Sequence, residues 1–410
     1  MALALDNARV IDCLGEPFTG HVVVEGDRIA AVGRGQAPAG PRRIDLGGRS
    51  VLPGLIDTHV HLCLDGGVSP AAQVTSETYA MTLLRAARNA RRQIESGVTT
   101  VRDLGARSCL DAYGPGGIAY NLKRAIAEGL CPGPRIVASG LAITITGGHS
   151  HWMGREADGA EAVRAAVHAE LQEGADVIKF MATGGIATQT SSDRFAAQLT
   201  HDELRAGVAE ARKAGRRTAA HAEGPEGILR ALEAGVDSIE HGSYLSDQAV
   251  ELMKDRGTVY VPTFAVRERL FTEGRGAGVP EFIVGQVERA IEAHAASVRR
   301  AHRAGLAVAM GTDAGASLFP HGQSALELGS YVRLGFSPME ALLSATRRAA
   351  ELLGLGEQLG TLERGKLADL IVVGGDPLTD IGVLARPEAI RLVLVGGAPA
   401  VDRDAFLAGP

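Results

Sequence analysis

The sequence predicts an α/β protein built around a (β/α)8 TIM barrel, with a small β-sandwich domain formed by both ends of the chain. Three observations predict this architecture. Between residues 50 and 350, short runs rich in β-branched residues alternate with longer segments of helical periodicity. Histidines, a lysine and an aspartate stand in or at the ends of several of these runs. Both ends of the chain instead contain short strands joined by glycine-containing turns.

The two ends of the chain show the same pattern of short predicted strands and glycine-containing turns. ARVID, GHVVVEGDRIAAVG and RRIDLGG lie near the start, and GKLADLIVVGGDP and AIRLVLVGGAPAVD lie near the end. Neither end could bury a core alone, so we expect them to meet in one β-sandwich. The predicted sandwich comprises residues 1–52 and 359–410, and the predicted barrel comprises residues 53–358.

Eight runs in the middle of the chain are predicted strands. They are VLPGLIDTHVH (51–61), GVTTVRDLG (97–105), PRIVASG (134–140), ADVIKFMATGG (175–185), RRTAAHAEG (216–224), VDSIEHG (236–242), GTVYVPT (257–263) and GLAVAMGTDAG (305–315). Each is followed by a segment of helical character, and one such helix should begin with a capping box formed by Thr200 and Glu203. Strands that alternate with helices pair in parallel, and eight such units in about 300 residues favour a barrel over an open sheet.

Composition argues against several kinds of partner. The chain has 410 residues, 45% of them hydrophobic, a formal net charge of -6, and no Lys or Arg run that could follow a phosphate backbone. Its apolar segments are too short for membrane helices, and its start lacks the pattern of a signal peptide. The cysteines at positions 13, 63, 109 and 131 have no CxxC spacing, which fits reduced thiols. We expect a cytoplasmic protein that acts on a small molecule, without nucleic acid or membrane, and we expect a homo-oligomer.

Four histidines and one aspartate stand at the carboxyl ends of predicted strands, which meet at one mouth of a barrel. His59 and His61 end the first strand, and alternation along a strand places them on one face. His221 ends the fifth strand, His241 the sixth and Asp313 the eighth. A lone histidine at a strand end is usually structural. Four that converge opposite a carboxylate predict a metal site, with zinc as the favoured metal.

Lys179 lies inside the apolar fourth strand, where an ammonium ion is unfavourable to bury. A salt-bridged structural lysine is one interpretation. Beside a divalent cation the charged amine would be disfavoured, and reaction with carbon dioxide would give an anionic carbamate (N6-carboxylysine) that can bridge two metals. We favour the carbamate because the histidines and Asp313 are predicted nearby.

Together these motifs resemble the amidohydrolase superfamily of metal-dependent hydrolases. The resemblance rests on PGLIDTHVHL, Lys179, His221, His241 and GTDAG, and it extends to GTLERGKLADLIVVGGDP near the end of the chain. TGGHSHWMGREADG and KFMATGG are most similar to the branch with imidazolonepropionase-like enzymes and metal-dependent Xaa-Pro dipeptidases (prolidases) and carboxypeptidases.

The resemblance implies two divalent metal ions. His59 and His61 would hold the more buried ion with Asp313, and His221 and His241 would hold the more exposed one. Carboxylated Lys179 and a hydroxide would bridge them. Two dications lower the pKa of a shared water, one polarises the scissile carbonyl, and Asp313 would pass the proton to the leaving nitrogen. The predicted reaction is hydrolysis of an amide bond in a dipeptide, such as Xaa-Pro, or in an N-acyl amino acid with a free carboxylate.

Three further residues are candidates for substrate contacts. The resemblance suggests that His149 polarises the substrate carbonyl. The family usually has Gly after this histidine, whereas Ser150 and His151 follow here, so both histidines are candidates. Tyr244 resembles a tyrosine that some relatives use to bind a substrate carboxylate. For His149 and Tyr244, a purely structural role is an equally good interpretation.

Three other functional classes fit the sequence less well. A serine hydrolase would need GxSxG, which the stretch GHSHW at 148–152 does not match. A mononuclear deaminase or an imidazolonepropionase-type cyclic amide hydrolase would use the same fold, but these relatives lack a bridging lysine, so Lys179 argues against them. A catalytically dead scaffold should have lost ligands, and here none is missing.

Overall fold

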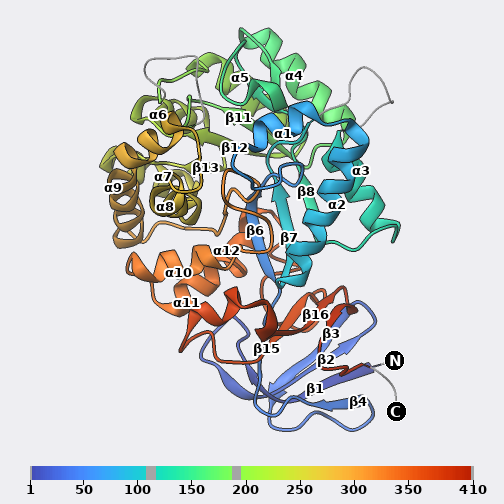
Figure 1. Ribbon diagram of the computed structural model, residues 1–410. Coiled ribbons are helices and arrows are strands. Elements are labelled where there is room, and N and C mark those ends of the chain that lie inside the picture. Colours follow the sequence, from blue (N-terminus) through green and yellow to red (C-terminus); the bar gives the residue numbers. More distant parts are fainter. Residues whose placement is uncertain (1, 108–116, 187–194, 408–410) are drawn as a thin grey trace.

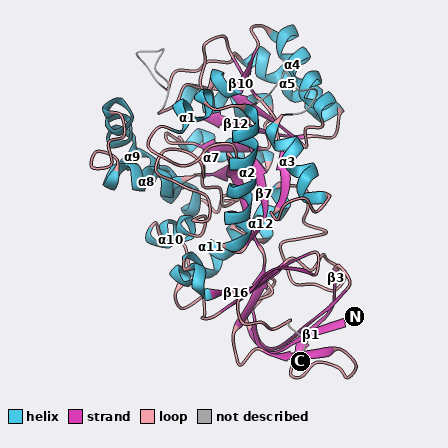
Figure 2. Cartoon of the chain, turned by 45° about the vertical axis from the view of Figure 1, so that its right-hand side comes forward, coloured by secondary structure: helices cyan, strands magenta, loops and turns pink. Residues whose placement is uncertain are grey.

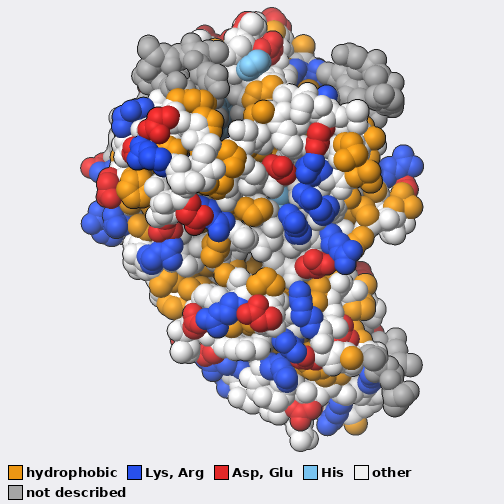
Figure 3. All heavy atoms as spheres, viewed as in Figure 1, with side chains coloured by type: hydrophobic (Ala, Val, Ile, Leu, Met, Phe, Trp, Pro, Cys, Tyr) orange, Lys and Arg blue, Asp and Glu red, His pale blue; other side chains and the backbone are white. Residues whose placement is uncertain are grey.

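The computed structural model describes residues 2–107, 117–186 and 195–407; Cys109 therefore lies outside the described residues. Figure 1 shows a large part in which helices surround parallel strands and, below it, a smaller part built of strands. No helix within the described ranges is long and apolar enough to cross a membrane. On the face in Figure 3, basic and acidic side chains are interspersed over both parts.

The smaller part is one sheet that contains strands from both ends of the chain, as Figure 2 also shows. Its order is β17-β16-β15-β5-β1-β2-β3, and β4 pairs with β1. The meeting of the two ends predicted from sequence is thus observed. The strands are β1 (Ala2–Val10), β2 (Phe18–Glu25), β3 (Arg28–Arg34), β4 (Arg42–Asp45), β5 (Ser50–Pro53), β15 (Leu370–Val373), β16 (Ile390–Val395) and β17 (Ala398–Asp402).

Residues from both ends also share one hydrophobic core. Leu5 and Val51 from the first strands are fully buried in the same cluster as Leu370 and Leu392 near the end of the chain. Burial of apolar side chains contributes roughly 1.5–3 kcal/mol each for residues of this size. The pairing is therefore stabilised by side chains that neither segment could bury alone.

The larger part contains two parallel sheets. One has the order β6-β7-β8, and the other has the order β10-β9-β11-β12-β13-β14. The strands are β6 (Leu55–Val60), β7 (Val98–Asp103), β8 (Arg135–Ala138), β9 (Ala142–Thr144), β10 (Gly154–Glu156), β11 (Val177–Met181), β12 (Arg217–Ala222), β13 (Ser238–His241) and β14 (Val259–Val261). The predicted parallel pairing is confirmed, and the short strands β9 and β10 were not expected.

The first predicted run, residues 51–61, is divided between the two parts. β5 pairs with β1 and β15 in the terminal sheet, whereas β6 begins the parallel strands. The division falls at Gly54, where an added Cβ would lie 2.2 Å from Oγ1 of Thr99. Only glycine allows this close approach, so the chain can pass from one sheet to the other there.

The eighth predicted run, residues 305–315, forms isolated bridges in place of a regular strand. Val308 bridges to Tyr260 of β14, and Ala314 bridges to Val60 of β6. Backbone amides extend these contacts, since the amide of Ala309 donates to Tyr260 and that of Thr58 donates to Met310. Asp313 has a φ of 60°, outside the range of a β-strand.

Helices follow the parallel strands along the chain, and Figure 1 shows them on the outside. The capping box of Thr200 and Glu203 at the start of α5 is confirmed. The helices are α1 (Pro70–Ser76), α2 (Tyr79–Glu95), α3 (Ile118–Ala127), α4 (Ala160–Glu173), α5 (His201–Lys213), α6 (Pro225–Ala234), α7 (Asp247–Arg256), α8 (Phe264–Glu273), α9 (Glu281–Arg303), α10 (Leu326–Arg333), α11 (Pro338–Ser344) and α12 (Arg347–Leu352). Single 3₁₀ turns occur at His151–Met153, Ile381–Ala385 and Pro387–Ala389.

Candidate active site

The carboxyl ends of the parallel strands surround a cavity of about 460 Å³. This volume is in the range of small-molecule sites. Eight of the nine site residues predicted from sequence line it: His59, His61, His149, His151, Lys179, His221, His241 and Asp313. The ninth, Tyr244, lies outside this lining, and its ring centroid is 5.5 Å from that of Phe195.

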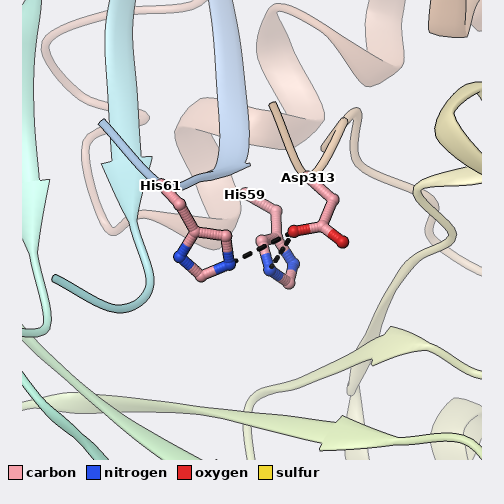
Figure 4. Close-up of side chains that lie close together, drawn as sticks. All are labelled: His59, His61 and Asp313. Atoms are coloured by element: carbon pink, nitrogen blue, oxygen red, sulfur yellow. Dashed lines mark ion pairs between the residues drawn. The ribbon is translucent and has the colours of Figure 1, made fainter. Parts of the chain in front are cut away.

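His59, His61 and Asp313 form a compact group, drawn in Figure 4. Oδ1 of Asp313 lies 3.2 Å from Nε2 of His61 and 3.7 Å from Nε2 of His59. Nδ1 of His61 donates to the backbone carbonyl of Gly105 at 2.9 Å, so its Nε2 carries the free lone pair. These three residues offer one ligand atom each within 4.8 Å of one another, as a shared metal ion would require.

A buried carboxylate fixes the orientation of His59. Nδ1 of His59 lies 2.8 Å from Oε2 of Glu240, and a carboxylate can only accept, so the imidazole donates there and leaves Nε2 for a metal. Oε1 of Glu240 accepts from Nη2 of Arg102 at 2.8 Å and from Oγ of Ser238 at 2.5 Å. Although burial raises the pKa of Glu240, Arg102 and His59 outweigh it and lower the pKa to about 2.

Glu240 and Arg102 were not among the site residues predicted from sequence. Two signals were available, because Arg102 is a charge inside the apolar stretch VTTVRD and Glu240 directly precedes His241. Neither signal identifies the partner, since 138 positions separate the two residues.

His221 and His241 approach the same place from neighbouring strands. Their ring centroids are 4.6 Å apart, and that of His241 lies 5.0 Å from that of His59. Nε2 of His221 donates to the carbonyl of Gly184 at 3.0 Å, which leaves Nδ1 for a ligand. Nδ1 of His241 contacts Oγ1 of Thr263 at 2.7 Å, which leaves Nε2. Each ring is thus held through one nitrogen while the other is available.

Burial keeps most of these imidazoles in the neutral form that binds metals. It lowers the pKa of His59 to about 4 and that of His221 to about 3, with the positive charge of Lys179 adding to both shifts. At Asp313, burial raises the pKa, but the interactions with His61 and His59 outweigh burial and hold the pKa below its usual range. Asp313 is therefore an anion at neutral pH.

Lys179 is the unusual member of the group. It lies on β11 and is 1% exposed. Its Nζ is buried and has no hydrogen-bond partner among the residues that the structure describes. Burial lowers its pKa to about 8, so a fraction of the amine is neutral near pH 7.5. Burying an amine without a hydrogen-bond partner is unfavourable. The neutral amine is the form that reacts with carbon dioxide.

The two loop histidines differ in position. The ring of His149 stacks on that of His221, with centroids 4.2 Å apart and planes at 20°. The side chain of His151 is 50% exposed, and its Nδ1 lies 3.7 Å from Glu156. Of the two, His149 is therefore the one that contacts a candidate metal ligand, His221.

Arg267 and Glu223 also line the cavity, although neither was predicted from sequence. Nη2 of Arg267 donates to Oε1 of Glu223 at 2.5 Å, and Oγ of Ser243 donates to Oε2 of Glu223 at 2.5 Å. Glu223 lies two positions after His221, and Ser243 lies two positions after His241. Through Glu223 and Ser243, Arg267 on α8 is therefore connected to the carboxyl ends of β12 and β13, the strands that carry His221 and His241.

The side chains in the cavity fit divalent metal ions. Neutral imidazoles and a carboxylate are the ligands that zinc and similar ions prefer. The orientation of His59 by Glu240, and of His61 by Gly105, is typical of metal-binding histidines. Nζ of Lys179 is buried without a hydrogen-bond partner among the described residues, and carboxylation would replace its positive charge with an anion that metal ions can bind.

Known proteins are similar to this chain over most of its length. The model of the amidohydrolase family matches residues 50–399. Ochratoxinase from Aspergillus niger is 32% identical over 403 residues, covering 90% of this chain and 80% of that one. Imidazolonepropionase from Cutibacterium acnes is 27% identical over 372 residues, covering 88% and 85%. A Xaa-Pro dipeptidase crystal structure with methionine bound in its active site superposes with a TM-score of 0.87 and 33% identity, covering 97% and 99%.

Proposed function

This chain belongs to the amidohydrolase family, and we propose that it is a binuclear metal-dependent hydrolase of dipeptides or N-acyl amino acids that carry a free carboxylate. Hydrolysis of a C-N bond follows from the family. The number of metals and the substrate class are the proposal. Similarity to a Xaa-Pro dipeptidase supports a substrate with an amide bond.

Six side chains would hold the two ions. His59, His61 and Asp313 would hold one ion, His221 and His241 would offer nitrogens to the second, and carboxylated Lys179 would be the sixth ligand. When bound, two zinc ions would polarise the substrate carbonyl and lower the pKa of a water molecule. The observation that carries the proposal is Nζ of Lys179. It is buried without a hydrogen-bond partner among the described residues, and Lys179 lines the same cavity as all five other candidate ligands.

The remaining chemistry belongs to side chains of this protein. Asp313 is an anion whose carboxylate can accept a proton and later deliver it to the leaving nitrogen. His149 stacks on His221 at the cavity wall, and it could donate a hydrogen bond to the substrate carbonyl oxygen. Tyr244 stays a candidate for a second substrate contact. If it binds the substrate carboxylate, Tyr244→Phe should reduce the preference for dipeptides over their C-terminal amides.

The experiment that tests this function is a hydrolysis screen. Zinc-loaded protein would be offered dipeptides, N-acyl amino acids, and matched lactams, cyclic ureas and exocyclic amines. The proposal expects peptides or N-acyl amino acids with a free carboxylate to be the best substrates. A preference for cyclic amides would replace it with the imidazolonepropionase-type reaction, which the similarity to imidazolonepropionase makes the second candidate.

The proposal extends to the fold. We propose that the parallel strands close into a (β/α)8 barrel over residues 53–358 and that the terminal sheet folds as a β-sandwich. The bridges of Val308 to β14 and of Ala314 to β6 support closure, because they join the last strand of one parallel sheet to the first strand of the other. Cytoplasmic location and homo-oligomeric assembly stay predictions from the sequence.

A further inference from the structure

The wall of the cavity contains a buried arginine that does not use all of its hydrogen-bond donors within the described residues. Arg267 is 5% exposed and lines the cavity together with the candidate metal ligands. Its Nη2 donates to Glu223, but its Nη1 is buried and has no hydrogen-bond partner among the described residues. Leaving a charged donor buried without an acceptor is unfavourable, so the site is built for an acceptor that a ligand can supply.

Arg267 is held firmly in place. Glu223 accepts from Arg267 with one oxygen and from Ser243 with the other, and it is fully buried. The helix that carries Arg267, α8, is anchored where it begins, because Glu327 accepts from the backbone amides of Phe264 and Ala265 at 2.7 and 2.6 Å. The guanidinium therefore does not have to be ordered when a ligand binds.

We propose that Arg267 forms a subsite for the free carboxylate of the substrate. A guanidinium has donors on two nitrogens in a fixed fork, so Arg267 can keep Glu223 on Nη2 while Nη1 binds an anion. Among the described lining residues the only other lysine or arginine is Lys179, which the proposed function converts to an anion. Arg267 is then the one cationic side chain available in this wall.

The subsite rests on the proposed function and makes its substrate class specific. Val266 and Leu270 flank Arg267 on α8 and also line the cavity, so an apolar side chain beside the carboxylate would be buried by the same helix. The ligand class is thus a carboxylate attached to an apolar group, as in an N-acyl amino acid or dipeptide with an apolar C-terminal residue.

The first test compares acid and amide substrates. For wild type, kcat/KM would be measured for a dipeptide ending in phenylalanine and for its C-terminal amide. The ratio of these two kcat/KM values, the acid-to-amide ratio, would then be measured for three variants. Arg267→Lys keeps a cation for Glu223 but loses the fork, and Glu223→Gln combined with Arg267→Met removes both charges together. Arg275→Met is the matched control, because Arg275 pairs with Glu281 and Glu288 at the surface.

We expect the acid-to-amide ratio to fall by about tenfold or more in both Arg267 variants, the scale of a lost charge-assisted hydrogen bond. The ratio of the Arg275→Met protein should equal that of wild type. If the ratio is unchanged in the Arg267 variants while Tyr244→Phe lowers it, the carboxylate is bound elsewhere and the subsite is refuted.

A binding measurement separates this inference from the proposed function. Calorimetry on zinc-loaded protein would compare 3-phenylpropionate with 3-phenylpropan-1-ol, neither of which contains an amide. Binding of the acid that weakens about tenfold in Arg267→Lys supports the subsite even if no peptide is cleaved. A preference for the acid that is the same in Arg267→Lys and wild type would assign the carboxylate to the metals and overturn the subsite.

Discussion

Glu240→Gln should weaken metal binding, because Glu240 orients His59. The carboxylate accepts from His59, Arg102 and Ser238 at 2.8, 2.8 and 2.5 Å. A glutamine has one oxygen and one NH2 group, so it cannot accept on both sides. If its oxygen stays with Arg102, its NH2 faces Nδ1 of His59. The imidazole must then rotate or move its hydrogen to Nε2, where the metal would bind.

Two magnitudes follow from this arrangement. Loss of a partner that orients a metal-binding histidine typically lowers metal affinity by about 10–100-fold. Arg102 is 1% exposed, and Glu240 is its only carboxylate partner among the described residues. Breaking a buried ion pair lowers the free energy of unfolding by roughly 3–5 kcal/mol. Zinc affinity would be measured by competition with a chelator, and stability by unfolding in guanidinium chloride.

Glu170→Gln is the control for this prediction. Glu170 is 2% exposed and pairs with Arg155 at 2.7 Å, but it contacts none of the site histidines. Its substitution should lower stability and leave zinc affinity unchanged. Equal zinc affinity in Glu240→Gln and wild type, or an equal loss in both variants, would refute the role of Glu240 in orienting His59.

Three other predictions concern single side chains. Lys179→Ala should lose bound metal and most activity, with partial recovery on adding acetate. Lys123→Ala should keep both, because Lys123 on α3 pairs with Asp176 and is 40% exposed. Metal and activity retained in Lys179→Ala would exclude the carbamate. Asp313→Asn should remain folded and bind at least one metal, yet turn over roughly 10²-fold more slowly, and near-normal turnover would remove Asp313 from proton transfer. His294 on α9 is 1% exposed, and burial lowers its pKa to about 3. As pH falls, this imidazole is protonated in the unfolded chain before it is protonated in the folded protein, so stability decreases below about pH 6.5. His294→Phe should therefore lose about 2 kcal/mol less than wild type between pH 7.5 and pH 5 in denaturant unfolding, and parallel curves for both proteins would contradict this.

Local patterns predicted the parallel strands and the residues at their ends. Alternation in DTHVH places His59 and His61 together, and an isolated lysine in ADVIKFM stands out because its environment is apolar. Parallel pairing then brings the strand ends to one edge, so Lys179, His221 and His241 could be grouped without knowing any side-chain contact.

Features that depend on distant partners could not be predicted. Glu223 and Arg267 are 44 positions apart, and nothing local indicates that their side chains meet. The division at Gly54 depends on Thr99, which packs where a Cβ would be. The run around Asp313 is apolar like a strand, but its positive φ and isolated bridges are set by β6 and β14 on either side.

The most direct test of the binuclear site is a titration of metal-free protein with zinc, in which bound metal per chain and the rate of dipeptide hydrolysis are measured together. The six candidate ligands exceed what one tetrahedral ion requires, so we predict about two ions per chain and activity that rises until the second is bound. Full activity at about one ion per chain would contradict the binuclear centre and favour a mononuclear hydrolase or deaminase.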